Sequence, residues 1–147
     1  MKRLVLIALC SLMICFTISA QKEAEEKGDV KAPAVLKAAF AKQFPKATDV
    51  KWEKEGGNWE VALKNNGQEM TVVMNSKGVV TETEVGIKVT ELPAVITKYV
   101  AEKFKGKKIL TVDKITAGTK ITYEVVVQKG KAMMFDATGK YLNTGKD

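Results

Sequence analysis

Carboxylates are the side chains in this sequence whose spacing could support chemistry. Glu82 and Glu84, in the string TETE, would share one face of a strand, because alternate residues of an extended chain point the same way. Such a pair could serve acid–base catalysis or bind a hard cation. Charges on a solvated strand would show the same spacing. A cation or small-ligand carrier in the cell envelope therefore remains the alternative function.

Other common catalytic sites lack their residues. The chain has no histidine, and its two cysteines, Cys10 and Cys15, fall within the first 20 residues. This excludes Ser–His–Asp and Cys–His nucleophiles and Cys/His zinc sites from residue 21 onward. Ser76, the one serine beyond residue 20, stands beside Lys77 in the turn-like string NSKG, where a turn role is favoured. We therefore expect no catalysis, no cofactor and no metal site.

The first 20 residues have the pattern of a secretory signal peptide. Lys2 and Arg3 precede an uncharged run from Leu4 to Ala20 that ends in small residues. Cleavage after Ala20 would remove both cysteines and leave one ordinary domain without disulfides. We expect a periplasmic or secreted protein, a flexible charged tail at 21–30, and no membrane attachment after cleavage.

The positive charge is carried almost entirely by lysine. The 24 basic residues against 17 acidic ones give a formal net charge of +7, yet Arg3 is the only arginine. Arginine is the side chain best suited to bidentate recognition of phosphate and guanine. The lysines are also scattered along the chain. We therefore expect a solvated lysine-rich surface and no nucleic-acid partner.

The chain contains two copies of one unit. PAVLKAAFAKQF (33–44) aligns with PAVITKYVAEKF (93–104), and the apolar residues of both follow one stripe of an amphipathic helix. Each copy begins with proline, which the first turn of a helix tolerates. Thr90 is a candidate cap for the second helix.

Strand-like segments follow each helix. Gly56-Gly57 and Asn66-Gly67 predict tight hairpins, because such turns need positive φ. The predicted strands are 48–55, 58–65, 68–75 and 79–89 in the first copy, and 108–116, 120–128, 131–136 and 140–143 in the second. We predict an α+β fold in which two tandem helix-plus-four-strand repeats, 31–88 and 89–147, make a single domain, 31–147. Its antiparallel sheet would have about eight strands, with both helices packed on one face.

Alternation assigns the two faces of this sheet. Val50, Trp52 and Trp59 are predicted to face the helices, with both tryptophans in the core. The opposite face can remain in water in an antiparallel sheet, and Val73 and Val126 would be its apolar members. This uncovered face is the predicted binding surface. Its candidate residues are Lys51, Glu53, Glu60, Lys64, Glu124 and Gln128.

One stretch of sequence resembles a known family. The string PAVLKAAFAKQFPKATDVKWEKEGGNWEVAL (33–63), with MNSKGVVTETE and ELPAVITKYVAEKF after it, resembles the PepSY-like family of small secreted bacterial proteins, which is related in fold to the beta-lactamase inhibitor protein. The resemblance runs from about Pro33 to Leu142. Its marks include the pairs Trp59-Glu60 and Tyr123-Glu124 and the Asn/Asp-x-x-Gly turns at 75–78 and 136–139.

The resemblance implies a tandem helix-plus-four-strand architecture and a periplasmic or secreted location. It also implies binding to a protein such as a peptidase or other hydrolase. Together with the absence of catalytic residues, it predicts a non-catalytic module that binds an unknown protein or peptide of the cell envelope. The identity of the partner and the oligomeric state stay open.

Overall fold

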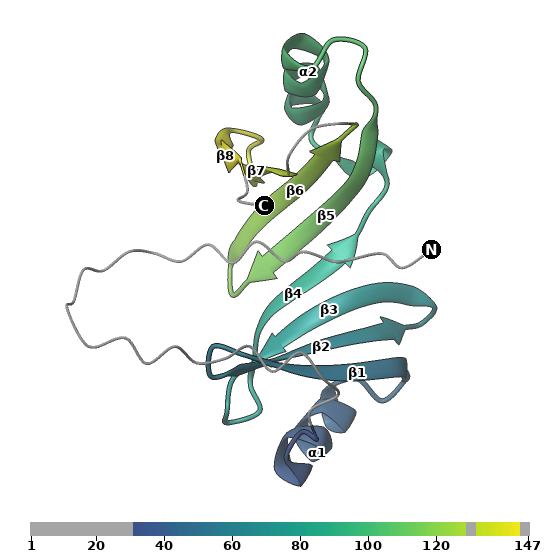
Figure 1. The fold of residues 1–147 in the computed structure, drawn as a ribbon, viewed down its shortest axis with the longest axis vertical. Helices are drawn as coiled ribbons and strands as arrows, with labels where there is room; N and C mark the ends of the chain where they lie inside the picture. Colours follow the sequence, from purple (N-terminus) through teal and green to yellow (C-terminus); the bar gives the residue numbers. More distant parts are fainter. Residues whose placement is uncertain (1–30, 129–131, 145–147) are drawn as a thin grey trace, which may run out of the picture.

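The computed structural model describes residues 31–128 and 132–144 (Figure 1). The predicted signal peptide and charged tail lie outside these residues. In chain order the elements are α1 (Ala34–Gln43), β1 (Ala47–Glu55), β2 (Asn58–Asn65), β3 (Gln68–Met74), β4 (Val80–Gly86), the 3-10 turn η1 (Val89–Glu91), α2 (Ala94–Lys103), β5 (Ile109–Ala117), β6 (Lys120–Val127), β7 (Ala132–Asp136) and β8 (Tyr141–Thr144). The predicted α+β class and the tandem repeats are confirmed.

The eight strands form one antiparallel meander in the order β1 to β8. Tight turns with positive φ, such as Gly56-Gly57 and Asn66-Gly67, connect neighbouring strands. The two repeats join through β4 and β5, whose ladder has four residue pairs, from Thr83↔Thr116 to Gly86↔Asp113. The sheet is continuous, but its middle ladder is short.

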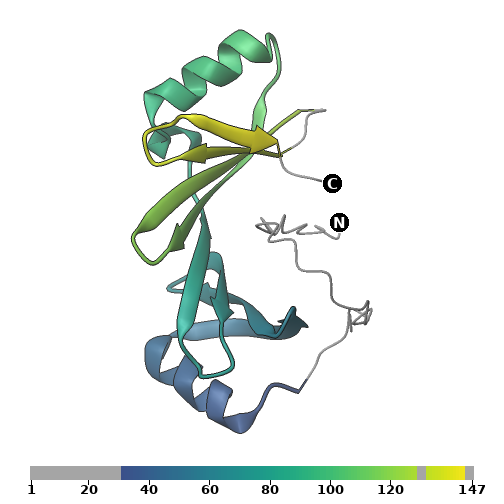
Figure 2. The ribbon, with the colours of Figure 1, turned by 90° about the vertical axis from the view of Figure 1, so that its left-hand side faces the viewer.

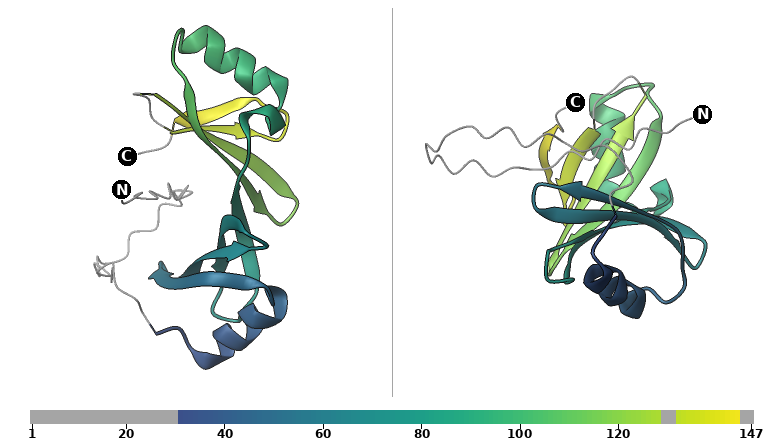
Figure 3. Two further views of the ribbon diagram at one scale, coloured as in Figure 1. Left: turned by 90° about the vertical axis from the view of Figure 1, so that its right-hand side faces the viewer. Right: turned by 60° about the horizontal axis from the view of Figure 1, so that its bottom comes forward.

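Each repeat has its own hydrophobic core beneath its own helix. Leu36 and Phe40 of α1 pack with Val61, Val72 and other residues of β1–β3. The second core has the same plan, with Ile96 and Val100 of α2 packed against residues of β5–β7. Both helices lie on the same face of the sheet, at opposite ends of the molecule (Figures 1 and 2). Figure 3 shows how far the sheet twists between them.

The tryptophans belong to the first core, as predicted. Trp52 and Trp59 are each 7% exposed. The Phe40 and Trp52 ring centroids are 5.3 Å apart, and the two indoles are 6.2 Å apart, both in edge arrangements. Tyr99, Phe135 and Tyr141 form the corresponding aromatic cluster in the second core. The indoles are therefore packing groups and do not form a binding platform.

The two Asx-x-x-Gly turns hold the helices against the sheet. The Asn75 Oδ1 accepts the N–H groups of Lys77 and Val79 at 3.0 and 3.1 Å, and the Asp136 Oδ1 accepts those of Thr138 and Lys140 at 2.9 and 3.0 Å. Each turn ends in a buried glycine with positive φ, Gly78 under α1 and Gly139 under α2. The turn role predicted for NSKG is confirmed.

Two local predictions are wrong. Thr90 lies inside η1, and α2 begins after Pro93 without a side-chain cap. Val50 is 37% exposed and does not join the core, because a bulge between Thr48 and Lys51 interrupts the alternation. Within this bulge Asp49 has a φ of 54°. A bulge adds an unpaired residue, which alternation along a sequence cannot anticipate.

Candidate functional site

The helix-free side of the sheet carries a groove of about 360 Å³. Within the described residues both helices pack on the other side, and we call this helix-free side the open face. Glu60, Val73, Glu124 and Met134 of the groove alternate with core residues of β2, β3, β6 and β7, so this side of the sheet follows from the period of two in those strands. Its charged members are Glu55, Glu60, Glu82, Glu84, Glu124 and Lys120, and its apolar members are Val73, Ile115, Ala117, Met134 and Leu142.

Strand register places the carboxylates around an apolar floor. Glu60 of β2 and Glu82 of β4 lie opposite Val73 of β3 from its two sides. Glu84 of β4 lies opposite Ile115 of β5. Glu124 of β6 also lines the groove, so both repeats contribute acids to it.

Asp113 adds a further carboxylate beside this groove. It lies opposite Glu124 of β6, and its neighbour across the β4–β5 ladder is Gly86. Glu84 lies two residues before Gly86 on β4 and therefore on the same face. Asp113 and Glu84 therefore bring acids of the two repeats together where the repeats join.

Partial burial keeps these carboxyl groups from ionising at their usual pH. Burial, reinforced by nearby Glu55, Glu53 and Glu82, raises the pKa of Glu60 to about 7. Burial likewise raises the pKa of Glu84 to about 7, and the neighbouring acids, with Asp113 first, add to the effect.

The remaining acids of this region shift in the same direction. Burial raises the pKa of Glu82, although Lys120 works against it. It also raises the pKa values of Asp113 and Glu124, and for Glu124 the charge of Asp113 contributes. The open face therefore gathers carboxyl groups that ionise less readily than usual, with Lys120 as the one lysine lining the groove among the described residues.

Ion pairing within the protein does not relieve this charge. Among the described residues the one salt bridge is at the sheet margin, where Lys64 Nζ lies 2.7 Å from Asp49 Oδ2. In the same part of the chain, no three Asp, Glu, His or Cys side chains form a group that could hold a metal ion. The groove is thus suited to attracting cationic groups over a wide surface, without a metal-type site at its centre.

The structure brings two of the six predicted site residues into the groove, namely Glu60 and Glu124. Glu53 lies opposite Glu60 on β1, outside the groove, and Lys51 lies opposite Ala62. Lys64 is engaged with Asp49 at the margin. Gln128 follows the end of β6, where its side chain is exposed and its backbone N–H donates to the Lys108 carbonyl.

Sequence reasoning did not assign Glu82, Glu84 and Asp113 to the binding surface. The spacing of Glu82 and Glu84 did indicate a shared face. Asp113 follows buried Val112 on β5, and this alternation indicates that Asp113 faces the helix-free side of the sheet. The join between the repeats could not be inferred locally, because the β4–β5 pairing crosses η1 and α2.

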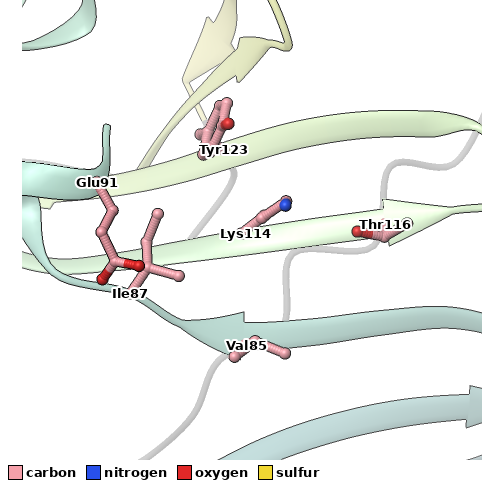
Figure 4. A pocket seen from close by; sticks show the side chains of 6 residues that line it. All are labelled: Val85, Ile87, Glu91, Lys114, Thr116 and Tyr123. Atoms are coloured by element: carbon pink, nitrogen blue, oxygen red, sulfur yellow. The ribbon is translucent and has the colours of Figure 1, made fainter. Parts of the chain in front are cut away.

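A second hollow, of about 320 Å³, lies on the helix-bearing side where the repeats join. Val85, Ile87, Glu91, Lys114, Thr116 and Tyr123 line it (Figure 4). The Lys114 amine points away from Glu91 in this view. The Glu91 carboxylate already accepts the backbone N–H of Lys88 at 2.8 Å. The polar groups therefore do not converge on a common ligand position.

Over the described part of the chain, the helices are too short or too polar to cross a bilayer.

Comparison with protein families gives one match, and it occurs twice. The family model described as "Putative beta-lactamase-inhibitor-like, PepSY-like" matches residues 22–82 and again 74–143. Within the described residues the first match runs from α1 into β4, and the second runs from the end of β3 into β8. No curated protein matches the chain.

Solved structures share the fold at low sequence identity. A BLIP-like protein from Bacteroides fragilis is 21% identical, with a TM-score of 0.64 over 84% of this chain and 95% of that one. A protein from Bacteroides eggerthii, described as periplasmic, is 16% identical, with a TM-score of 0.66 over 78% and 88%. A DUF2874 family protein from Bacteroides ovatus is 18% identical, with a TM-score of 0.62 over 78% and 87%.

Proposed function

The chain belongs to the PepSY-like, beta-lactamase-inhibitor-like family, and we propose that it is a non-catalytic periplasmic module that docks a protein or peptide of the cell envelope on its open face. The groove across both repeats is the observation that carries this proposal. Its periplasmic location is supported by a fold relative described as periplasmic and by the signal-like N-terminus.

The chemistry of the groove favours macromolecular docking over catalysis. A catalytic site needs a nucleophile or an acid–base pair aimed at one point, whereas these carboxylates are spread over four strands. Val73, Ile115 and Met134 provide an apolar floor between them. An apolar centre with a charged rim is typical of protein interfaces.

Inhibition of a peptidase or other hydrolase is the finer form of this proposal. The family description supports an inhibitor-like role, and a non-catalytic partner-binding face would suit it. The fold alone does not determine the target, because one fold hosts many functions.

A carrier of cations or small ligands has less support. In the described residues the acids do not group as metal ligands, and the hollow in Figure 4 lacks convergent polar groups. Thermal-shift measurements with calcium and envelope metabolites distinguish the two functions, since a ligand of the folded state raises the melting temperature. A clear rise with calcium would favour the carrier.

Site-specific photo-crosslinking in the native envelope tests the docking face. A crosslinking amino acid would replace Ala62 or Lys120 on the open face, and Lys37 or Lys98 on the helices as controls; all four side chains are exposed. We expect a discrete adduct from the open-face positions and none from the helix positions. Adducts formed only from the helices would contradict the proposal.

A further inference from the structure

Building on the proposed function, we propose that the segment received by the open face is cationic, with a lysine or arginine side chain held between carboxylates from the two repeats. The first repeat supplies Glu60, Glu82 and Glu84, and the second supplies Glu124 with Asp113 beside it. A partner side chain on the floor formed by Val73 and Ile115 would therefore meet acids on both sides of the join.

The charge of the groove is opposite to the net charge of the chain. The whole chain has a formal net charge of +7, yet the groove contains five carboxylates and a single lysine, Lys120. Lys64, whose ammonium pairs with Asp49, lies outside the groove. The groove therefore has the opposite sign to the rest of the molecule, and a positive segment is the occupant it attracts most strongly.

The floor of the groove suits the side chains of lysine and arginine. Lysine and arginine side chains have apolar stems and charged ends, and they bury the stem while the end reaches polar groups. Val73, Ile115 and Met134 offer surface for the stem, and Glu60, Glu84 and Glu124 can accept from the charged end. A neutral apolar segment would bury these carboxyl groups further and require them to take up protons, which is costly at pH 8.

Proton linkage makes the inference measurable. The charged groups in and beside the groove are Glu53, Glu55, Glu60, Glu82, Glu84, Asp113, Glu124, Lys51 and Lys120, and the cross-strand pair Lys64 and Glu69 lies further along the same face. Glu60 and Glu84 have pKa values of about 7, so they are largely protonated at pH 5.5 and largely ionised at pH 8. A cation favours the ionised form, and its binding should release protons and weaken as the pH falls.

The direct test uses a fluorescent nine-residue peptide with three lysines spaced by glycine and serine. A matched peptide has glutamine at the three lysine positions. Binding to the protein without residues 1–20 is followed by fluorescence anisotropy at low salt and pH 8. The test variant is Glu60→Gln/Glu84→Gln/Glu124→Gln, which removes charge at nearly constant size. The control is Glu102→Gln on an exposed position of α2.

We expect the lysine peptide to bind more tightly than the glutamine peptide. Each peptide lysine is exposed and would interact with a half-buried glutamate. Three such interactions together should raise the affinity about tenfold, and the triple variant should lose this gain. The control should stay within about twofold of the parent, and binding should weaken several-fold from pH 8 to pH 5.5. Equal binding of both peptides, or no loss in the triple variant, would overturn the inference.

Two further readouts separate this inference from the function on which it rests. If the open-face adducts persist unchanged in the triple variant, the partner does not use a cation there and only the inference fails. If the parent protein forms no open-face adduct, the proposed function fails.

Sedimentation at increasing concentration tests whether the lysines of a second copy fill the groove. If the parent protein self-associates and the triple variant is monomeric, the occupant is a second copy, and the proposal of a different partner protein is overturned. Thermal melts of the variants confirm that they fold.

Discussion

At the scale of single residues, the open face carries half-buried carboxyl groups. A glutamate on a solvated strand should titrate near its ordinary value, but burial raises the pKa values of Glu60 and Glu84 to about 7. A protein that needs only stability gains nothing from such groups, since apolar residues could fill the same positions. Their presence on an uncovered face is consistent with a binding role.

These groups make a prediction about stability and pH. Between the unfolded value of 4.5 and about 7, the folded state holds more protons than the unfolded chain. Stability should therefore fall as the pH rises through this window and stay lower above it. Calorimetry should show a melting temperature several degrees higher at pH 5 than at pH 8. Glu84→Gln should narrow this difference, and a melting temperature that rises from pH 5 to pH 8 would contradict the assignment.

The pKa of Asp136 makes stability change with pH in the opposite direction. Its pKa is held below the usual range, chiefly by the hydrogen bond from Thr138. Stability from this turn is present above the unfolded pKa of 3.8 and is lost as the pH falls through the lower folded value. The pH of greatest stability should therefore lie near 5.

Tryptophan emission offers a second residue-scale prediction. Trp52 and Trp59 are each 7% exposed, and Trp52 packs against both Phe40 and Trp59. Their emission should be blue-shifted, and iodide should quench it weakly compared with the same protein in denaturant. Strong quenching in the native state would place the indoles on the surface.

At the scale of elements, the Asx-x-x-Gly turns fix each helix to its sheet. A Cβ added to Gly139 would collide with Val95 Cγ1 of α2, and one added to Gly78 would lie 2.8 Å from Ala39 Cβ of α1. Both glycines also have positive φ. These positions therefore need glycine for two reasons, backbone conformation and close approach.

Gly139→Ala tests this role, and Gly118→Ala is its matched control. Gly118 has positive φ but nothing near its added Cβ, so alanine there should cost only the backbone strain, about 1 kcal/mol. At Gly139 the collision should add about 1–3 kcal/mol. Urea denaturation measures both. Equal losses at the two glycines would show that the contact with α2 contributes nothing.

The success of sequence reasoning at this scale has a physical cause. Hairpin turns, the period of two in NWEVALKN and the apolar helical stripes are local signals, so both helices and all eight strands could be predicted. The bulge at Asp49 and the 3-10 turn at Thr90 could not, because neither changes the apolar pattern. The groove needed the pairing of β4 with β5, which local signals do not specify.

At the scale of the whole molecule, two cores share one sheet. The core beneath α1 and the core beneath α2 have no buried residue in common, and the ladder between them has four residue pairs. The repeats should therefore unfold partly independently, as contiguous cooperative units do. The groove spans this join, so a bound partner would also link the two repeats.

Core substitutions in each repeat test this independence. Leu36→Ala and Ile96→Ala remove equivalent fully packed side chains, at an expected cost of about 2–5 kcal/mol each. Native-state hydrogen exchange should speed up chiefly in the first repeat for Leu36→Ala and chiefly in the second for Ile96→Ala. Uniform acceleration throughout the described strands would instead indicate one cooperative unit.

A partner that docks as proposed lies on the open face across both repeats. Backbone amide NMR of residues 21–147 measures this most directly. The protein is titrated first with the lysine peptide and then with the purified partner that the crosslinking identifies. We predict that the shifted amides cluster near Val73, Glu84, Ile115 and Thr122, while those of α1 and α2 stay unchanged. Shifts confined to the helices, or to one repeat alone, would contradict the account.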